Sequence, residues 1–369
     1  MKRTVLVLML CISLLFTSCG KTAKNDIVEI PKPEEDKIFA VWISCYELQP
    51  LFSQGDEQKF KVKVDEIFEK CLSNGINTVF LQVRPFCDAL YPSGNFPWSQ
   101  YALDKKGKPP EYDPLEIFVN SAHENNIALH AWINPYRISY KPEFTPDDRF
   151  SDTAVSCDEG VYLQPANIES QKIVLDGVRE ILENYNVDGI HIDDYFYPVK
   201  YKGFDSAEYK AYRNNGGKMS LSDWRISNVN SLVSAMYTLV HSFGEDKIFS
   251  ISPAADITKN KFSYYADIAL WCERGGYADW IIPQIYFGFE HEKKPFEKVK
   301  KEWEKLAEGS HIRLICGLAA YKISQPDSAA GSGKNEWIDN PDVIKRQIEC
   351  VSADSVWSGY SLFSYSYLT

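Results

Sequence analysis

The chain has 369 residues, of which 44% are hydrophobic and 25% charged, with a formal net charge of -11 at pH 7. This composition is typical of a folded protein that forms one large domain or two modest ones. The acidic balance argues against a nucleic-acid partner, because phosphates require a basic protein face.

The first residues have the pattern of an export signal. Lys2 and Arg3 precede an apolar run over 5–16, which small residues follow. The run is shorter than the ~20 residues that a membrane-spanning helix needs. We therefore expect residues 1–18 to be a secretory signal peptide.

Cys19 directly follows this segment, and the sequence before it resembles a lipoprotein lipobox. This predicts a lipid anchor on Cys19 and an exported protein on the extracytoplasmic side of a bacterial cell envelope. The polar, proline-bearing residues 19–37 then form a tether rather than a fold. The alternative is a secreted protein in which Cys19 has no such role.

Seven other cysteines follow the signal and the proposed anchor. Their number is odd, their spacing is wide and no C-x-x-C pair occurs, so the sequence does not support a zinc site. We expect most of them to be small buried apolar residues. They are Cys45, Cys71, Cys87, Cys157, Cys272, Cys316 and Cys350.

From residue 38 onward, short β-rich runs alternate with longer amphipathic stretches. This alternation predicts parallel strands joined by helices, and eight such strands predict a single (β/α)₈ TIM barrel over 38–369. A doubly wound open sheet is the alternative, but no glycine-rich phosphate loop follows a strand. The strands are expected near 39–44, 77–84, 128–136, 189–194, 248–253, 280–287, 313–321 and 359–367.

The strands also predict which side chains face the barrel interior, because alternate residues point to opposite faces. In "GIHID", Ile190 and Ile192 suit the helix-facing side, so His191 and Asp193 point inward. Polar and aromatic residues are expected inside other strands or at their carboxyl ends, where barrel enzymes bind substrate. Gln82 is expected to face inward, and the predicted substrate-binding residues are Trp42, Arg84, Trp132, Asn134, Tyr136, His191, Tyr195, Gln284 and Tyr286. A buried, satisfied His191 remains the structural alternative.

The loops that follow strands are long, for example 85–111 and 138–167, whereas the loops that enter strands are short. The long loops carry many rings, including Phe86, Tyr140 and Tyr195. Aromatic rings suit the flat faces of sugars, although loop packing alone is the other explanation.

The adjacent aspartates of "GIHIDDYFYP" are the leading catalytic candidates. Asp193 is expected at the mouth as nucleophile or base, with Asp194 projecting differently and supporting it. Glycoside hydrolysis needs two carboxyl groups, ~5 Å apart in a retaining enzyme and ~6.5–9.5 Å apart in an inverting one. A helix cap or a metal-binding turn is the alternative for this pair.

The second carboxyl group is less clear from the sequence. Glu290 and Asp256 follow the sixth and fifth strands, and Asp88 and Glu273 are secondary candidates. No G-x-S-x-G, H-E-x-x-H or P-loop motif is present, and no organic cofactor is implied.

Several blocks resemble the glycosyl hydrolase-like 10 family, from about Phe39 to the C-terminus. They are "FAVWIS", "GINTVFLQVRPFCDALYPSGNFPWSQY", "DPLEIFVNSAHENNIALHAWINPYRI", "VDGIHIDDYFYP", "WIIPQIYFGF" and "GLAAYKI". The resemblance implies a TIM-barrel glycosidase, usually exported and often a bacterial lipoprotein. Some members act on the glycan strands of peptidoglycan. "GIHID" is also similar to the α-amylase-type strand that carries the nucleophile, but the matching glutamate after strand five is missing.

We therefore expect an envelope-anchored glycoside hydrolase that acts on an extracytoplasmic polysaccharide, with Asp193 as nucleophile or base and Glu290 or Asp256 as proton donor. The rival hypothesis is a non-catalytic glycan-binding lipoprotein on the same barrel. An esterase or deacetylase is less favoured, because no nucleophilic serine motif or metal-ligand spacing is present.

Overall fold

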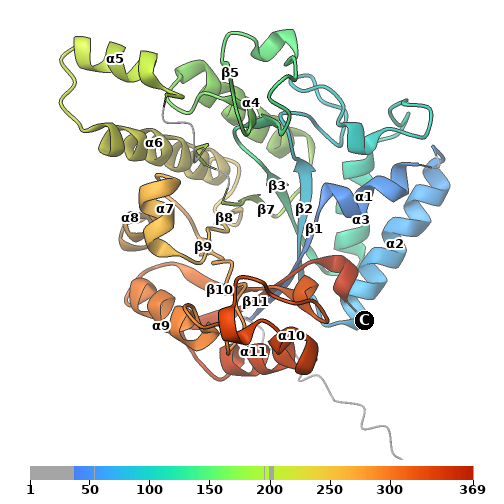
Figure 1. Ribbon diagram of the computed structural model, residues 1–369. Helices are drawn as coiled ribbons and strands as arrows, with labels where there is room; N and C mark the ends of the chain where they lie inside the picture. Colours follow the sequence, from blue (N-terminus) through green and yellow to red (C-terminus); the bar gives the residue numbers. More distant parts are fainter. Residues whose placement is uncertain (1–36, 54, 195, 199–202, 369) are drawn as a thin grey trace, which may run out of the picture. The chain divides into compact units, whose positions relative to one another are not determined.

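The computed structural model describes residues 37–53, 55–194, 196–198 and 203–368 (Figure 1). The predicted signal peptide, the tether up to residue 36, Cys19 and Tyr195 lie outside these residues. Within them, no helix is both long and apolar enough to cross a membrane.

Eight parallel strands close into a barrel in the order β1-β11-β10-β9-β8-β7-β3-β2 (Figure 1). Closure is made by β1 and β11, whose register pairs Ile38 with Gly359. The TIM-barrel prediction is confirmed, and the open-sheet alternative is wrong. The strands are β1 (Ile38–Ile43), β2 (Thr78–Arg84), β3 (Ala128–Ile133), β7 (Gly189–Ile192), β8 (Ile248–Ile251), β9 (Trp280–Ile281), β10 (Arg313–Leu318) and β11 (Trp357–Phe363).

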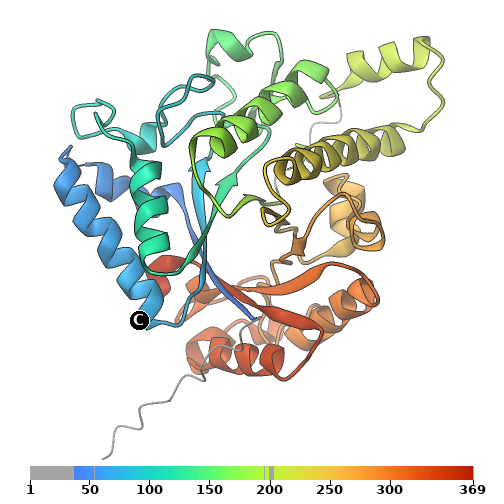
Figure 2. The ribbon, with the colours of Figure 1, turned by 180° about the vertical axis from the view of Figure 1, so that it is seen from behind.

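Helices surround the barrel (Figures 1 and 2). In α4, the Asn167 side chain caps the first turn by accepting the Glu169 N–H, and Val174, Val178 and Ile181 form the buried face. The helices are α1 (Cys45–Phe52), α2 (Glu57–Ser73), α3 (Pro114–Glu124), α4 (Ile168–Asn184), α5 (Ser206–Asn214), α6 (Leu221–His241), α7 (Ile257–Ser263), α8 (Ile268–Glu273), α9 (Phe296–Ala307), α10 (Glu336–Asp339) and α11 (Val343–Ser352). Short 3₁₀ turns are η1 (Gln100–Ala102), η2 (Asp148–Phe150), η3 (Ala320–Lys322), η4 (Gly331–Gly333) and η5 (Tyr365–Tyr367).

The hydrophobic residues divide into two layers, as strand alternation requires. Ile190 and Ile192 belong to the large cluster between the strands and the helices. A second cluster fills the barrel interior and consists of Ala40, Trp42, Phe80, Trp132, Trp280, Ile282 and Ile315. The interior is therefore a packed core rather than a channel, and a ligand has access only at its ends.

The loop after β3 contains a small antiparallel sheet that the sequence did not predict. It consists of β4 (Arg137–Ser139), β6 (Gly160–Leu163) and β5 (Ala154–Cys157), in that order. Gly160 has a φ of 136°, and a Cβ at this position would collide with the Ser139 carbonyl oxygen. Only glycine allows this approach of the two strands. The predicted third barrel strand was too long, since β3 ends at Ile133.

The seven described cysteines are free thiols, and all but Cys350 are buried. This confirms the prediction that most are buried apolar residues. Burial raises the pKa of the Cys87 thiol to about 12. A thiol of this kind stays protonated and unreactive at neutral pH.

Candidate active site

Asp193 follows β7 at the carboxyl end of the barrel and is buried, with 5% of its surface exposed. A chain of three hydrogen bonds leads to it from the first residue of α1. The Cys45 N–H donates to Gln82 Oε1 (2.9 Å), Gln82 Nε2 donates to Asn134 Oδ1 (2.7 Å), and Asn134 Nδ2 donates to Asp193 Oδ2 (2.6 Å).

The direction of this chain is fixed at its start, because a backbone N–H can only donate. Gln82 must therefore accept through its oxygen and donate through its nitrogen, and Asn134 must do the same. The chain ends by presenting an N–H to the Asp193 carboxylate, which favours the charged form of the acid. Gln82 was predicted to face inward but was not assigned to the site, and its part as a positioning residue is visible only in the folded barrel.

Asp194 is held from the opposite side. Gln284 Nε2 donates to the Ser252 carbonyl oxygen (3.1 Å) and approaches Asp194 Oδ1 (3.4 Å). Ser252 follows β8 and Gln284 follows β9, whereas Asn134, the partner of Asp193, follows β3. The two adjacent carboxyl groups therefore diverge, one toward β3 and the other toward β8 and β9, with the mouth between them.

Burial also changes the ionisation of Asp194. Burial raises the pKa of Asp194, against the opposing effects of the Gln284 hydrogen bond and the charges of Lys259 and Arg137. A raised pKa keeps a proton on a carboxyl group closer to neutral pH, as a general acid requires. The carboxyl end of the barrel thus holds Asp193, which accepts an amide N–H, and Asp194, whose pKa is raised.

Asp256 does not suit its predicted role as proton donor. Its side chain caps α7 by accepting the Lys259 N–H (2.9 Å), and it forms an ion pair with Lys294 (2.6 Å). Burial by itself would raise its pKa, but the Lys294 and Lys259 hydrogen bonds outweigh burial and lower it. A carboxylate held in this way gives up its proton readily, so the structure gives no support to Asp256 as proton donor.

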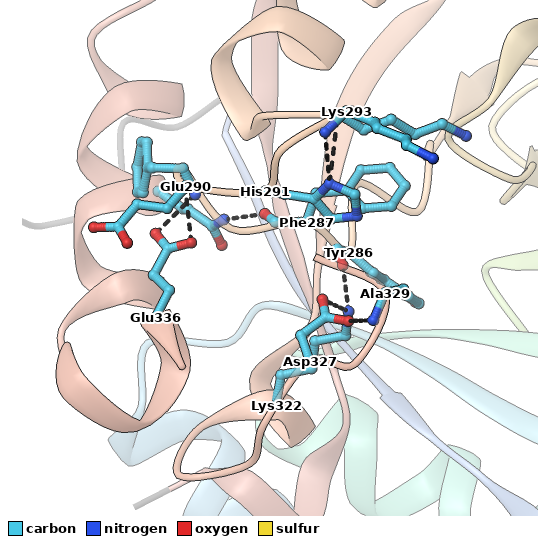
Figure 3. Close-up of polar contacts among 12 residues, drawn as sticks. Tyr286, Phe287, Glu290, His291, Lys293, Lys322, Asp327, Ala329 and Glu336 are labelled. Carbon is cyan, nitrogen blue, oxygen red and sulfur yellow. Dashed lines mark hydrogen bonds and ion pairs between the residues drawn. The ribbon is translucent and has the colours of Figure 1, made fainter. Parts of the chain in front are cut away.

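Glu290 is also far from the predicted arrangement. Its side chain is exposed, and among the described residues it contacts neither Asp193 nor Asp194. Figure 3 shows that the buried Glu336 of α10 holds this loop by accepting the N–H groups of Phe289 (2.8 Å) and Glu290 (2.9 Å). The structure gives no support to Glu290 as proton donor. Glu273, a secondary candidate, is exposed at the end of α8.

A lysine secures the start of the same loop. Lys322 Nζ donates to the Tyr286 carbonyl oxygen (2.7 Å) and pairs with Asp327 Oδ2 (2.7 Å), as Figure 3 shows. The Tyr286 ring is half-buried and lies 5.9 Å from the Tyr321 ring and 6.1 Å from the Phe363 ring. Tyr286 therefore occupies a fixed position beside Gln284.

His191 and Trp42 lie beneath the mouth instead of lining it. Trp42 Nε1 donates to His191 Nε2 (3.0 Å), so the neutral imidazole carries its proton on Nδ1 and donates to Ser250 Oγ (2.8 Å). Burial, followed by the neighbouring His130, lowers the pKa of His191 well below its usual value. The predicted substrate contacts of Trp42 and His191 are wrong, because each satisfies the other within the barrel.

Arg84 points away from the interior. The register of β2 against β3 shifts between Gln82 and Arg84, and an irregularity of this kind reverses the alternation of side chains. The Arg84 guanidinium lies 3.8 Å from the centre of the Phe96 ring, where a Cβ on Gly177 of α4 would collide with it. The prediction that Arg84 contacts substrate is therefore wrong. Tyr136 is likewise buried in the outer hydrophobic cluster and not at the mouth.

Trp132 keeps the position predicted for it at the end of β3. It belongs to the interior cluster, and its indole N–H is buried without a hydrogen-bond partner among the described residues. A buried donor of this kind costs free energy unless a ligand or water accepts from it. The polar groups that the structure brings to the aspartates are those of Asn134 and Gln284.

The sequence also aligns with characterised families. The model of the family described as Glycosyl hydrolase-like 10 matches residues 37–338. The chain belongs to the glycosyl hydrolase-like 10 family.

Curated relatives of this family member carry the name glycosyl hydrolase. Glycosyl hydrolase YngK of Bacillus subtilis (strain 168) is 31% identical over 309 residues, which are 77% of this chain and 60% of YngK. Glycosyl hydrolase DigH of Escherichia coli (strain K12) is 32% identical over 326 residues, which are 80% of this chain and 73% of DigH. The chain thus spans less than two thirds of the length of YngK.

A solved structure with the same fold is the PgaB (BpsB) glycoside hydrolase domain from Bordetella bronchiseptica. It superposes with a TM-score of 0.60 at 12% identity, over 89% of this chain and 93% of that domain. At this identity the likeness concerns the fold. A closed barrel of this kind is therefore shared with a glycoside hydrolase domain.

This glycosyl hydrolase-like 10 member has a cavity in the loops that follow β2 and β3. It has a volume of about 510 Å³ and lies between the loop after β2 and the segment that runs from β4 to η2. Asp88 lies in its wall, and burial raises the pKa of this carboxyl group to about 6, ahead of hydrogen bonds with Ser99 and Phe86 that oppose the shift. Asp88 was only a secondary candidate in the sequence, because nothing there showed its burial.

Proposed function

We propose that this protein is a glycoside hydrolase whose reaction takes place between Asp193 and Asp194. The observation that carries the proposal is the divergence of these two neighbours, one facing an amide donor and the other half-buried with a raised pKa. Glycoside hydrolysis requires this division between a charged carboxylate and a proton-bearing carboxyl group.

In this mechanism Asp194 gives its proton to the glycosidic oxygen as the bond to the anomeric carbon breaks. In one route Asp193 attacks the anomeric carbon and forms a glycosyl ester, which water then hydrolyses while the deprotonated Asp194 removes a proton from that water. In the other route Asp193 removes a proton from a water molecule that attacks the anomeric carbon directly. The chain from Cys45 through Gln82 and Asn134 holds the Asp193 carboxylate in place during the reaction. The products are an alcohol and a sugar with a new reducing end.

The substrate in this proposal is an extracytoplasmic polysaccharide, with the glycan strands of peptidoglycan as the first choice. The signal-like residues 1–18 and the lipobox-like position of Cys19 support an enzyme anchored by lipid at the bacterial cell envelope. The family resemblance supports peptidoglycan, because some members act on its glycan strands.

The rival function, glycan binding without catalysis, has one observation in its favour. Asp256 and Glu290, which the sequence suggested as proton donors, do not face the pair. Hydrolysis then depends on Asp194 as the acid, and an inactive Asp194 would leave a binding protein.

The test is hydrolysis of peptide-free peptidoglycan glycan and a panel of α-glucans by the full-length protein, followed as new reducing ends. Asp193→Asn and Asp194→Asn are compared with Asp256→Asn, a matched change outside the proposed reaction. We expect activity in the wild type and in Asp256→Asn and its loss in the other two. Glycan binding without hydrolysis by the wild type would establish the rival function, and equal cleavage by all four proteins would remove both aspartates from the mechanism.

A further inference from the structure

The cavity in the loops that follow β2 and β3 has walls that are suited to a sugar ring. Its volume of about 510 Å³ lies within the range of ligand-sized pockets, ~300–1,000 Å³. Tyr140 and Phe144 leave 48% and 44% of their surfaces in solvent, which is unusual for large rings. Aromatic faces of this kind pack against the C–H faces of sugars. The rings in the lining are Phe86, Trp98, Tyr101, Tyr140, Phe144 and Phe150.

The cavity lining contains two aspartates, Asp88 and Asp147, and one lysine, Lys141. Asp147 pairs with Arg149 (2.8 Å), which leaves Asp88 as the carboxyl group of interest. Its Oδ1 accepts the Phe86 N–H (2.9 Å), which fixes the carboxylate in the wall. Among the described residues, no lysine, arginine or histidine forms an ion pair with it. A half-buried carboxylate without a close cation leaves its charge incompletely compensated, and a cationic ligand group would compensate it.

Arg137 connects this cavity to the aspartate pair. Its buried guanidinium lies 4.8 Å from the centre of the Phe86 ring and 4.3 Å from that of the Tyr140 ring, both in the cavity wall. The same charge acts on Asp194, where it opposes the effect of burial on the pKa. The cavity therefore lies within electrostatic reach of the proposed reaction, as a neighbouring sugar subsite would.

We propose that the cavity is a glycan subsite for a hexosamine residue that carries a free amino group, with the ammonium on Asp88 and the sugar ring on the aromatic walls. The proposal rests on the function proposed for Asp193 and Asp194 and adds a preference among their substrates. An N-acetylated hexosamine stacks equally well but brings no cation to Asp88. Stacking thus provides affinity for both sugars, and the carboxylate discriminates between them.

The experiment measures binding of a chitosan tetrasaccharide and a chitin tetrasaccharide by calorimetry. The full-length protein carries Asp193→Asn, so that turnover does not interfere. To this background we add Asp88→Asn, which keeps an acceptor for the Phe86 N–H, or Asp104→Asn, which changes the same loop outside the cavity lining. A third variant, Tyr140→Ala, removes one of the exposed aromatic rings that line the cavity.

We expect the free-amine tetrasaccharide to bind more tightly than the acetylated one by roughly 10- to 100-fold, the effect of one charge-assisted hydrogen bond. Asp88→Asn should abolish the difference and Asp104→Asn should keep it. Tyr140→Ala should weaken both ligands alike. Equal affinity for the two tetrasaccharides, or a preference that survives Asp88→Asn, would overturn the subsite.

Hydrolysis of peptide-free glycan by the wild type separates this inference from the proposed function. Cleavage that requires Asp193, together with equal binding of the two tetrasaccharides, overturns the subsite and leaves the hydrolase. Selective binding that depends on Asp88, without hydrolysis of any glycan, overturns the hydrolase and leaves the subsite.

Discussion

An aspartate lies at each end of strand β7, and the two aspartates have different hydrogen-bond partners. Before the strand, Asp188 Oδ2 accepts hydrogen bonds from His123 Nε2 (2.9 Å) and the Leu129 N–H (2.7 Å). After the strand, Asp193 receives the Asn134 amide at the open mouth of the barrel. Partners at the entering end tie one strand to the next, whereas the Asn134 amide holds Asp193 at the end of the barrel where we propose that the reaction takes place.

The entering end repeats this arrangement around the barrel. Before β9, Asp279 Oδ2 accepts from His241 Nε2 (3.1 Å) and from the Phe249 N–H (2.7 Å). An aspartate thus has a structural role at the entering end of a barrel strand and, in the proposed function, a chemical role at the other end. This agrees with the general division of TIM barrels into a stabilising face and a catalytic face.

The largest effect should come from Asp193→Asn. Loss of the nucleophile or base should lower kcat/KM by several orders of magnitude, while the amide keeps the shape of the side chain. Reducing-end release from glycan measures the rate, and circular dichroism checks the fold. The matched change Asp188→Asn at the other end of β7 should retain activity. Comparable losses in both variants would break the comparison between the two ends.

Asp194→Asn should lower hydrolysis by roughly 10²- to 10⁴-fold, the usual contribution of a general acid. The raised pKa of Asp194 keeps its proton to a higher pH than usual, and activity is lost as the pH rises through that pKa. The variant should therefore lose this alkaline limb in a profile of kcat/KM against pH. An aryl glycoside with a good leaving group should lose much less activity than glycan. An unchanged limb in the variant would assign the titration to another group.

Asp188→Ala should lower the free energy of unfolding by about 1–3 kcal/mol, because the buried strand N–H of Leu129 and the ring of His123 lose their acceptor. Activity per folded molecule should remain close to that of the wild type. Urea unfolding followed by tryptophan fluorescence measures the first quantity and reducing-end release the second. A loss of hydrolysis without a loss of stability would show that Asp188, at the entering end of the barrel, takes part in the reaction.

His191→Phe tests the barrel interior. The change leaves the Trp42 N–H and the Ser250 hydroxyl without their partner, at a cost of about 1–3 kcal/mol in unfolding free energy. Because the imidazole is neutral and satisfied beneath the mouth, the pH profile of hydrolysis should keep its shape. A shifted profile would return His191 to the reaction.

The smallest effect should come from Asp256→Asn, which breaks a partly exposed ion pair with Lys294 and is expected to cost below about 1 kcal/mol. The pKa of Asp256 is lowered in the folded protein, so its stabilising contribution is present above the unfolded pKa and is lost as the pH falls. The stability difference from the wild type should accordingly disappear in acid. A large loss of hydrolysis at unchanged stability would restore Asp256 as the proton donor.

The pattern of the sequence determined the barrel. Alternation of strand and helix, together with period-two alternation within "GIHID", predicted eight parallel strands and the inward direction of His191 and Asp193. These features are local, because the spacing of apolar residues along one element decides which face it buries. The position of Asp193 and Asp194 after the fourth barrel strand could also be predicted, because it depends only on where that strand ends.

Only the tertiary structure decided which polar side chains are already satisfied within the protein and which remain available to a ligand. The shifted register after Gln82 turned Arg84 outward, and the pairing of Trp42 with His191 satisfied both within the core. Burial raised the pKa of Asp194 and Asp88, while Lys294, 38 residues further along the chain, kept the pKa of Asp256 low. Ionisation and hydrogen bonding depend on neighbours brought together by folding, and sequence spacing does not reveal those neighbours.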